Sequence, residues 1–241
     1  MLSVILAAAA LLPLPAQLPT VPRLIQQASP VYCGGMRGRN VALTFDDGPS
    51  PYTLQLTRVL RRLNARATFF DVGSRIGYWP GAVSAQARVG ELGNHTWSHP
   101  HLTDLSLVDA RRELESTQRT IGRAGDTVPQ LFRPPYDQAT SDIDGLARSL
   151  GLLDIRWSAD SGDSRAGTPP TAVVRAAIAA LRPGAIILFH DPHPSTPAVA
   201  AAVVRAAHRK GLRPVTVSEL LAREPPSATQ LASTGASRCV P

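Results

Sequence analysis

The stretch that decides the fold reads VALTFDDGP and covers residues 41–49. Val41–Phe45 is an apolar run of strand length, Asp46 and Asp47 follow it directly, and Gly48-Pro49 then imposes a turn. Neighbouring residues of a strand point to opposite faces, but a turn at this place can direct both carboxylates into one pocket. One aspartate could then ligate a metal ion while the other acts as a base. The alternative is a surface turn, because Asp, Gly and Pro all favour turns.

The rest of the chain alternates between strand-like and helix-like segments. Further strand-like segments are Ala67–Val72, Glu91–His95, Leu131–Arg133, Leu153–Trp157, Ala185–Phe189 and Pro214–Val217. Helix-like segments are Pro51–Asn64, Gly81–Val89, Leu107–Arg123, Ser141–Leu150, Pro170–Leu181, Thr196–Lys210 and Glu219–Arg223. Such alternation predicts an α/β fold with a parallel sheet and helices outside it. The spacing fits both a closed barrel and an open doubly wound sheet, and the length of 241 residues fits a single catalytic domain.

Ionisable side chains lie at five of the predicted strand ends or in the loops that follow them. Carboxyl ends of parallel strands meet at one edge of a sheet, so we expect these side chains to converge although they are far apart in the sequence. They are Asp46-Asp47, His95, Arg133, the Asp160/Asp163 segment and His190-Asp191.

Two histidines, His95 and His99, stand four residues apart. If this stretch were helical, both imidazoles would lie on one helix face and could hold one cation. With the carboxylate of Asp47 they would form a set of two histidines and one carboxylate that leaves positions open for water and substrate. Zinc is the first expectation for such a hydrolytic site, and iron or cobalt is the alternative. We interpret the nearby His101 as a loop residue.

Arg133-Pro134-Pro135-Tyr136 fixes an arginine at a strand end with a rigid turn. Arginine can hold a carboxylate through two parallel hydrogen bonds, so Arg133 could orient Asp46 and keep it ionised. The turn could also aim the backbone N–H of Tyr136 at a developing oxyanion. The alternative is a proline turn with a surface arginine.

His190 ends the sixth predicted strand. A histidine there could donate a proton to a leaving group at physiological pH. Asp163, in the preceding loop, could bind the other ring nitrogen and raise the pKa of His190. The alternative is a core histidine with structural hydrogen bonds only.

The composition excludes a disordered or fibrous protein, because 44% of the residues are hydrophobic and 18% are charged. Lys and Arg number 25 against 18 Asp and Glu, a net charge of +7, and the isoelectric point is about 10.4. Such a charge favours polyanionic partners. The sequence contains no helix-turn-helix, zinc finger or alternation of aromatic and basic residues that would indicate nucleic acid. We therefore expect the anionic cell wall, and not nucleic acid, as a partner.

The N-terminal segment predicts export. Residues 1–22 carry no charged side chain, and the apolar run Leu2–Leu12 has the length of a signal-peptide core but is too short to span a bilayer. Residues 1–22 are thus a signal peptide or an uncleaved N-terminal anchor, with contact to the membrane only in the second case; a buried helix is the remaining alternative. Residues 23–39 would form an N-terminal extension and residues 224–241 a polar C-terminal tail.

Two cysteines, Cys33 and Cys239, are too few for a disulfide scaffold or a cysteine-rich zinc module. In an exported protein they could form one disulfide that ties the two ends of the domain together. The alternative is two free thiols.

Taken together, these motifs resemble the polysaccharide deacetylase family, also known as the NodB-homology family or carbohydrate esterase family 4. The resemblance extends from Asn40 to about Leu221, within a domain of residues 40–223. It implies a distorted (β/α)7-type barrel and a metal-dependent deacetylation. The matching segments, in order, are Thr44–Gly48, His95–His99, Arg133–Tyr136, Trp157–Asp163 and Leu188–His190.

The resemblance also implies a role for each residue. One divalent metal ion, most simply Zn²⁺ with Co²⁺ or another divalent ion as alternatives, would be held by Asp47, His95 and His99. Asp46 would be the base, oriented by Arg133, and His190 the acid, supported by Asp163. The residues around the substrate and the oxyanion would be Pro135, Tyr136 and Leu188.

Two positions depart from the family's pattern. Asp137 stands where a glycine often follows the tyrosine, and Ser164 stands where a tryptophan usually forms a wall of the acetyl pocket. The resemblance implies a secreted, monomeric enzyme that acts on N-acetylglucosamine units, first of peptidoglycan and second of chitin oligomers. Acetylated xylan is a third substrate class. The alternative from another class of protein is a cell-wall binding protein without catalytic activity, which these two departures would favour.

Overall fold

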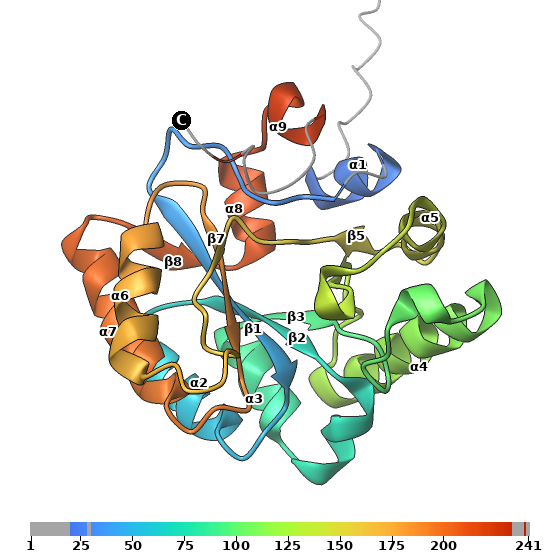
Figure 1. Ribbon diagram of the computed structural model, residues 1–241, viewed down its shortest axis with the longest axis horizontal. Coiled ribbons are helices and arrows are strands. Elements are labelled where there is room, and N and C mark those ends of the chain that lie inside the picture. Colours follow the sequence, from blue (N-terminus) through green and yellow to red (C-terminus); the bar gives the residue numbers. More distant parts are fainter. Residues whose placement is uncertain (1–19, 28–29, 233–238, 240–241) are drawn as a thin grey trace, which may run out of the picture.

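A computed structural model describes residues 20–27, 30–232 and 239 of the chain. In this part of the chain, eight parallel strands form one curled sheet at the centre of the molecule (Figure 1). The strands are β1 Asn40–Gly48, β2 Ala67–Asp71, β3 Gly90–Asn94, β4 Leu131–Phe132, β5 Leu153–Asp154, β6 Ala159–Asp160, β7 Ile186–His190 and β8 Arg213–Val215. Their order is β5-β4-β3-β2-β1-β7-β6, and β8 pairs with the first residues of β1. The α/β class is thereby confirmed, and the seven strands of this path form the curled sheet of the distorted (β/α)7-type barrel, with β8 as a short addition beside β1.

Helices surround the sheet. On one side lie α2 Thr53–Arg62, α3 Ala82–Val89, α6 Pro170–Ala180 and α7 Thr196–Arg209, and on another lie α4 Leu107–Gly125 and α5 Ser141–Ser149 (Figure 1). The end of the barrel where β1 begins carries α1 Thr20–Gln27, α8 Val217–Arg223 and α9 Ala228–Ala232. Short 3₁₀ turns follow three strands: η1 Gly73–Tyr78, η2 Leu102–Asp104 and η3 Pro135–Asp137.

Alternation along β1 places apolar and polar side chains on different faces. Phe45 points into the layer between sheet and helices, where its ring packs between Phe69 and Phe189 with centroid distances of 5.7 and 5.4 Å. Each buried ring contributes roughly 1.5–3 kcal/mol to folding. The neighbouring residues Thr44 and Asp46 point to the opposite face, into the barrel. The packing of the phenylalanines therefore also fixes the direction of the Asp46 carboxylate.

One predicted strand differs from the structure. The segment Leu153–Trp157 does not form a single strand, because β5 ends at Asp154 and the chain bends before it forms β6 beside β7. Arg156 accompanies this bend, since its Nε donates to both carboxylate oxygens of Asp154 at 2.8 and 3.0 Å. Beyond Asp154 the backbone N–H of Arg156 donates to the carbonyl oxygen of Val31 at 2.8 Å, so the chain passes from β4 to the segment that precedes β1.

The two ends of the described chain meet near the start of β1. Cys33 and Cys239 form a disulfide with Cα atoms 6.0 Å apart, which confirms the first of the two alternatives. Of the predicted signal peptide or anchor, residues 1–19 lie outside the described residues, and the segment from Thr20 belongs to α1, where Val21 and Leu24 are buried. Among the helices described, none is long and apolar enough to cross a membrane.

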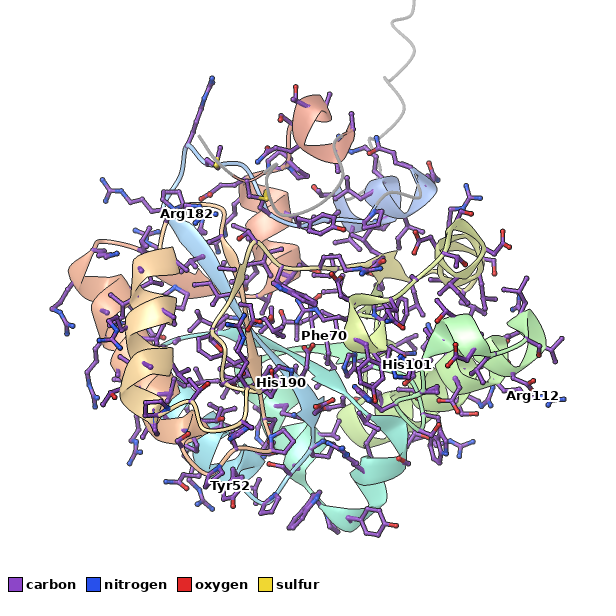
Figure 2. All side chains as sticks on the ribbon, viewed as in Figure 1. Tyr52, Phe70, His101, Arg112, Arg182 and His190 are labelled. Carbon is purple, nitrogen blue, oxygen red and sulfur yellow. A yellow bond between two sulfur atoms is a disulfide. The ribbon has the colours of Figure 1, made fainter. Side chains whose placement is uncertain are left out.

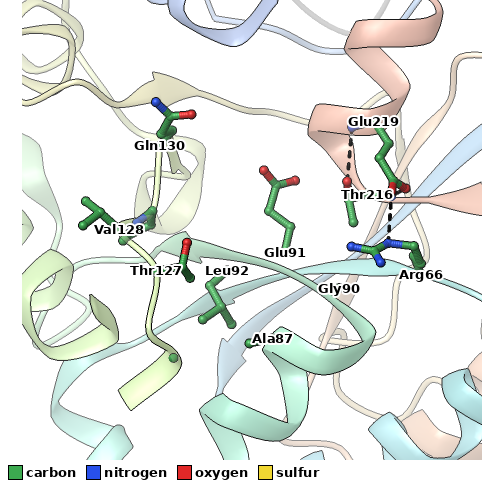
Figure 3. Close-up of a pocket in the computed structure, with 12 residues that line it drawn as sticks. Arg66, Ala87, Gly90, Glu91, Leu92, Thr127, Val128, Gln130, Thr216 and Glu219 are labelled. Atoms are coloured by element: carbon green, nitrogen blue, oxygen red, sulfur yellow. Dashed lines mark hydrogen bonds and ion pairs between the residues drawn. The ribbon is translucent and has the colours of Figure 1, made fainter. Parts of the chain in front are cut away.

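The start of β3 lies beside a hollow at this same end of the barrel. Glu91 accepts hydrogen bonds from the backbone N–H of Ser218 at 3.0 Å and from its hydroxyl, and burial raises the pKa of Glu91. The hollow, of about 370 Å³, is lined by Glu91 and by Arg66 and Glu219, which form an ion pair at 3.2 Å (Figure 3). It lies at the opposite end of β3 from His95, so these contacts stabilise the barrel away from the predicted site.

Candidate active site

Strand pairing brings the predicted site residues to one end of the barrel. In the register between β1 and β7, Asp46 is opposite His190. Asn94 of β3 is opposite Phe132 of β4, so His95 and Arg133, the next residues along, leave the sheet side by side. The convergence predicted for the strand ends is therefore present.

Three potential ligand atoms face one another beside the Asp46-Asp47 turn. Asp47 Oδ1 lies 3.5 Å from His95 Nε2 and 3.1 Å from His99 Nε2, and the three atoms lie within 4.8 Å of one another. Asp47 Oδ1 is buried, and no N–H or O–H of the described residues points at it with hydrogen-bond geometry. An unpartnered carboxylate oxygen that faces two imidazole nitrogens fits a divalent cation.

The segment from His95 to His99 is a loop and not the helix that we considered. Thr96 and His99 adopt left-handed backbone conformations, with φ of 67° and 60°. Side chains of the loop support this shape, since Asn94 Oδ1 accepts from the Thr96 N–H at 2.9 Å and Thr96 Oγ1 accepts from the His99 N–H at 3.1 Å. The chain doubles back and brings the centroids of the two imidazoles to 4.9 Å.

Glu113 of α4 holds the same loop from outside, and the sequence did not reveal it. One carboxylate oxygen accepts from the backbone N–H groups of Trp97 at 2.8 Å and Ser98 at 2.7 Å, and the other accepts from the Ser98 hydroxyl at 2.9 Å. Three donors from two consecutive residues thus meet one carboxylate, which fixes the chain between the two histidines. Glu113 is 15 residues beyond Ser98, on the polar side of a helix, where no local pattern distinguishes it.

Hydrogen bonds on the far side of each imidazole orient its Nε2 atom. His95 Nδ1 lies 2.7 Å from the carbonyl oxygen of Arg133, which only accepts, so Nδ1 carries the hydrogen and Nε2 keeps its lone pair. Burial lowers the pKa of His95, which also favours the neutral ring. His99 Nδ1 lies 3.2 Å from the hydroxyl of Tyr136. His101, in a loop as predicted, stacks on the Tyr136 ring with centroids 3.8 Å apart.

Arg133 is completely buried and lies 4.2 Å above the ring of Phe70, which Figure 2 labels near the middle of the molecule. Its Nη1 donates to Asp46 Oδ1 at 2.7 Å and to Thr44 Oγ1 at 2.8 Å. We predicted two parallel hydrogen bonds from Arg133 to Asp46, and this prediction is wrong, because only Nη1 reaches Asp46. Nε of Arg133 donates to the carbonyl oxygen of Ile155 at 2.9 Å instead. The other oxygen of Asp46 is left free of Arg133 and lies 3.8 Å from His95 Nε2.

His190 is held by Asp163 in the predicted way. His190 Nδ1 lies 2.8 Å from Asp163 Oδ1, and the backbone N–H of His190 donates to Asp163 Oδ2 at 2.7 Å. Burial lowers the pKa of His190, but the hydrogen bond to Asp163 and the negative charges of Asp46, Asp163 and Asp47 outweigh burial and raise that pKa to about 9. The ring is therefore protonated at neutral pH.

The turn after Arg133 contains the first departure from the family's pattern. Pro135 is buried, and Tyr136 and Asp137 both have a left-handed φ of 59°. Asp137 is paired with Arg156, whose Nη1 donates to its carbonyl oxygen at 2.7 Å and to its carboxylate. This pairing offsets the strain of an aspartate at a position that suits glycine.

Leu188, the remaining predicted residue, is buried on β7 in register with Thr44 and with Asp160. Its backbone carbonyl accepts from the N–H of Ser161 at 3.1 Å, which holds the start of the Asp163 loop against β7. The second departure, Ser164, is exposed in that loop.

Asp71 is another residue that the sequence analysis missed. It is completely buried at the end of β2, its Oδ1 accepts from Gln86 Nε2 at 2.9 Å, and burial raises the pKa of Asp71 to about 8. A Cβ atom on Gly48 would lie 2.6 Å from Asp71 Oδ1, so only glycine lets the Asp46-Asp47 turn pass this close. Asp71 also ends a strand, so the rule that ionisable residues at the carboxyl ends of parallel strands converge could have identified it.

The sequence is similar to a known protein family and to several curated proteins. Residues 34–154 match the polysaccharide deacetylase family. The chitooligosaccharide deacetylase of Rhizobium leguminosarum bv. trifolii is 37% identical over 191 residues, which covers 78% of this chain and 85% of that protein. The peptidoglycan-N-acetylmuramic acid deacetylase PdaC of Bacillus subtilis is 36% identical over 183 residues, which covers 75% of this chain and 38% of that protein. The chain spans about a quarter to two fifths of the length of the first curated relatives.

A solved structure supports the same relationship. The family 4 carbohydrate esterase of Streptomyces lividans, in complex with acetate, matches with a TM-score of 0.69 and 35% identity over 73% of this chain and 91% of that chain. The fold, the order of the motifs and the sequence similarity all indicate the same family. The chain belongs to the polysaccharide deacetylase family, carbohydrate esterase family 4.

Proposed function

We propose that this protein is a metal-dependent deacetylase that removes N-acetyl groups from N-acetylglucosamine units of a cell-wall polysaccharide. One observation carries the proposal: the unpartnered Asp47 oxygen faces His95 and His99 beside the Asp46 carboxylate, at the same end of the barrel as His190. This arrangement provides a cation site, a base and an acid within one small region. Membership of the family supports the same reaction.

The metal ligands in this proposal are Asp47, His95 and His99. Two imidazole nitrogens and one carboxylate oxygen suit Zn²⁺ first, with Co²⁺ or another divalent ion as alternatives. A divalent cation bound there lowers the pKa of a water molecule and polarises the acetyl carbonyl. The protein's part is to orient both imidazoles through the contacts of their Nδ1 atoms, and burial of His95 favours the neutral form of that ring.

Two further residues move protons. Asp46 takes the proton of the attacking water through the oxygen that Arg133 leaves free. His190, protonated at neutral pH through its contact with Asp163, donates a proton to the departing sugar amine. The reaction thus uses a carboxylate and an imidazolium on opposite residues of β1 and β7.

The substrate lies, in this proposal, over the turn at Pro135 and Tyr136 and against the end of β7 at Leu188. The Tyr136 backbone N–H would meet the oxyanion. Ser164 leaves the acetyl pocket more open than a tryptophan would. We propose peptidoglycan as the first substrate and chitin oligomers as the second, because the relatives include a peptidoglycan-N-acetylglucosamine deacetylase of Listeria monocytogenes and a chitooligosaccharide deacetylase. Both substrate classes and the uncharged N-terminal segment support secretion of the protein to the cell wall. We propose that the protein acts as a monomer.

Acetate release from N-acetylglucosamine oligomers, measured with and without a chelator, tests the proposal. We expect release that stops on chelation and returns with Zn²⁺. Release only from acetylated xylan would indicate an esterase that uses the same site. If neither polymer released acetate in the presence of Zn²⁺ or Co²⁺ while the protein still bound cell walls, the non-catalytic alternative would stand.

A further inference from the structure

The positive charge of this protein is concentrated on three adjacent helices. α2, α3 and α7 contain no Asp or Glu, and α2 packs against both α3 and α7 on one flank of the barrel (Figure 1). The exposed arginines on these helices carry a total charge of +6. The net charge of the whole chain is +7. These arginines, which we call the basic flank, are Arg58, Arg61, Arg62, Arg88, Arg205 and Arg209.

Within the basic flank, like charges stand next to one another on the same helix face. Arg58 lies three and four residues before Arg61 and Arg62, and Arg205 lies four residues before Arg209. Such pairs repel each other, and no ion pair of a basic-flank arginine occurs among the described residues. The helices tolerate this repulsion without a compensating acid.

Three arginines of α4 differ, although they are also exposed. Arg111 pairs with Glu115 at 3.3 Å and Arg112 with Asp109 at 2.9 Å, and Arg119 lies 3.5 Å from Glu115. Figure 2 shows Arg112 on the outer side of α4. The general arginine content of the chain does not by itself explain the basic flank, because α2, α3 and α7 together carry six arginines and no acid, whereas α4 carries acids between its arginines.

The basic flank also has a concave part. A groove of about 170 Å³ between α2 and α3 is lined by Arg58, Arg61 and Arg88, with Leu54 and Val89 among the apolar residues beneath. Arginine binds phosphate oxygens through parallel N–H groups, and three guanidinium groups around one groove suit a repeated phosphate better than a single carboxylate.

We propose that the basic flank binds a phosphate-bearing polymer of the cell wall, of the polyol phosphate type. The groove between α2 and α3 would hold one phosphate group, and the arginines of α7 would extend the contact along the chain of the polymer. Thr53, at the start of α2, contacts Asp191 beside the catalytic end, and Arg58, Arg61 and Arg62 lie further along the helix. Polymer bound there leaves the candidate active site open, and the inference does not depend on the proposed deacetylation.

The test compares two triple variants that remove equal charge. Arg58, Arg61 and Arg88 are replaced by Gln in one variant, and Arg111, Arg112 and Arg119 are replaced by Gln in the other.

The probe is fluorescent poly(glycerol phosphate), and its binding is measured by fluorescence anisotropy at about 50 and 200 mM salt. Between these two concentrations the Debye length shortens from roughly 14 to 7 Å. We expect the first variant to bind about tenfold more weakly at low salt, the control to change less than about twofold, and high salt to weaken the wild type. Turnover of neutral chitooligosaccharides should remain equal in all three proteins.

Two further probes decide the class of ligand. Polygalacturonate of equal charge should bind more weakly than poly(glycerol phosphate), and duplex DNA should not bind more tightly. Equal loss in both triple variants would mean that net charge alone attracts the polymer and would overturn the proposal. Equal binding of the carboxylate polymer, or tighter binding of DNA, would also overturn it.

Discussion

Asp46 and Asp47 are neighbours in the sequence, but their carboxylates contact different side chains. Asp46 is the last inward residue of an extended strand and meets Arg133 inside the barrel. Asp47 has a left-handed φ of 67°, which turns its carboxylate toward His95 and His99. A change in one backbone dihedral thus separates the proposed base from the proposed ligand.

Asp46→Asn should separate turnover from metal binding. Asparagine keeps an acceptor for Arg133 but cannot take the proton, so acetate release should fall about 10²–10⁴-fold while zinc affinity stays the same. Steady-state kinetics and a zinc titration measure the two quantities, and the unfolding temperature controls for the ion pair that Arg133 loses. Full turnover in this variant would show that another group is the base.

Asp163→Asn should change the pH dependence of the reaction. The pKa of His190 is raised to about 9, so the protonated acid is present below that pH and is lost as the pH rises through it. A cation at Asp47 would offset part of the negative charge and lower that limit. Loss of the Asp163 charge should move the alkaline limb of the pH–rate profile to lower pH by about one pH unit, with zinc affinity unchanged. An alkaline limb that does not move would contradict the assignment of His190 as the acid.

At the scale of elements, the loop between β3 and η2 depends on α4. The loop contains two left-handed residues, Thr96 and His99, and its backbone N–H groups at Trp97 and Ser98 are satisfied by Glu113. Without that carboxylate the loop would sample other shapes, and His99 would move away from His95. We therefore regard Glu113 as a positioning residue for the proposed metal site.

Glu113→Ala should weaken zinc binding about tenfold, since supporting groups around metal ligands have effects of this order. At saturating zinc the turnover should return to near the wild-type value, which distinguishes loss of position from loss of catalysis. Glu115→Ala is the matched control, because Glu115 lies on the same helix and contacts only arginines in the ion pairs described. Equal zinc affinity in the two variants would contradict the role of Glu113.

At the scale of the whole molecule, the sequence allowed much of the fold and the site to be predicted. Apolar runs followed by ionisable residues located the strands, and their parallel arrangement placed Asp46, His95, Arg133 and His190 together. These features are local or follow from one topological rule, so a single sequence contains them.

Other features depend on contacts that no local pattern encodes. The loop shape of His95–His99 follows from left-handed residues and from Glu113 on a distant helix. The single hydrogen bond from Arg133 to Asp46 follows from competition by the carbonyl of Ile155. The basic flank appears only when α2, α3 and α7 are placed side by side, because the sequence shows the net charge but not its distribution.

The central claim is that Asp47, His95 and His99 hold one divalent ion, and a calorimetric zinc titration of metal-free protein tests it most directly. We predict one ion bound per chain in the wild type, no measurable binding in His95→Ala, and unchanged binding in His208→Ala, which removes an exposed histidine from α7. Equal zinc affinity in His95→Ala and the wild type, or a wild type that binds no zinc, would contradict the account.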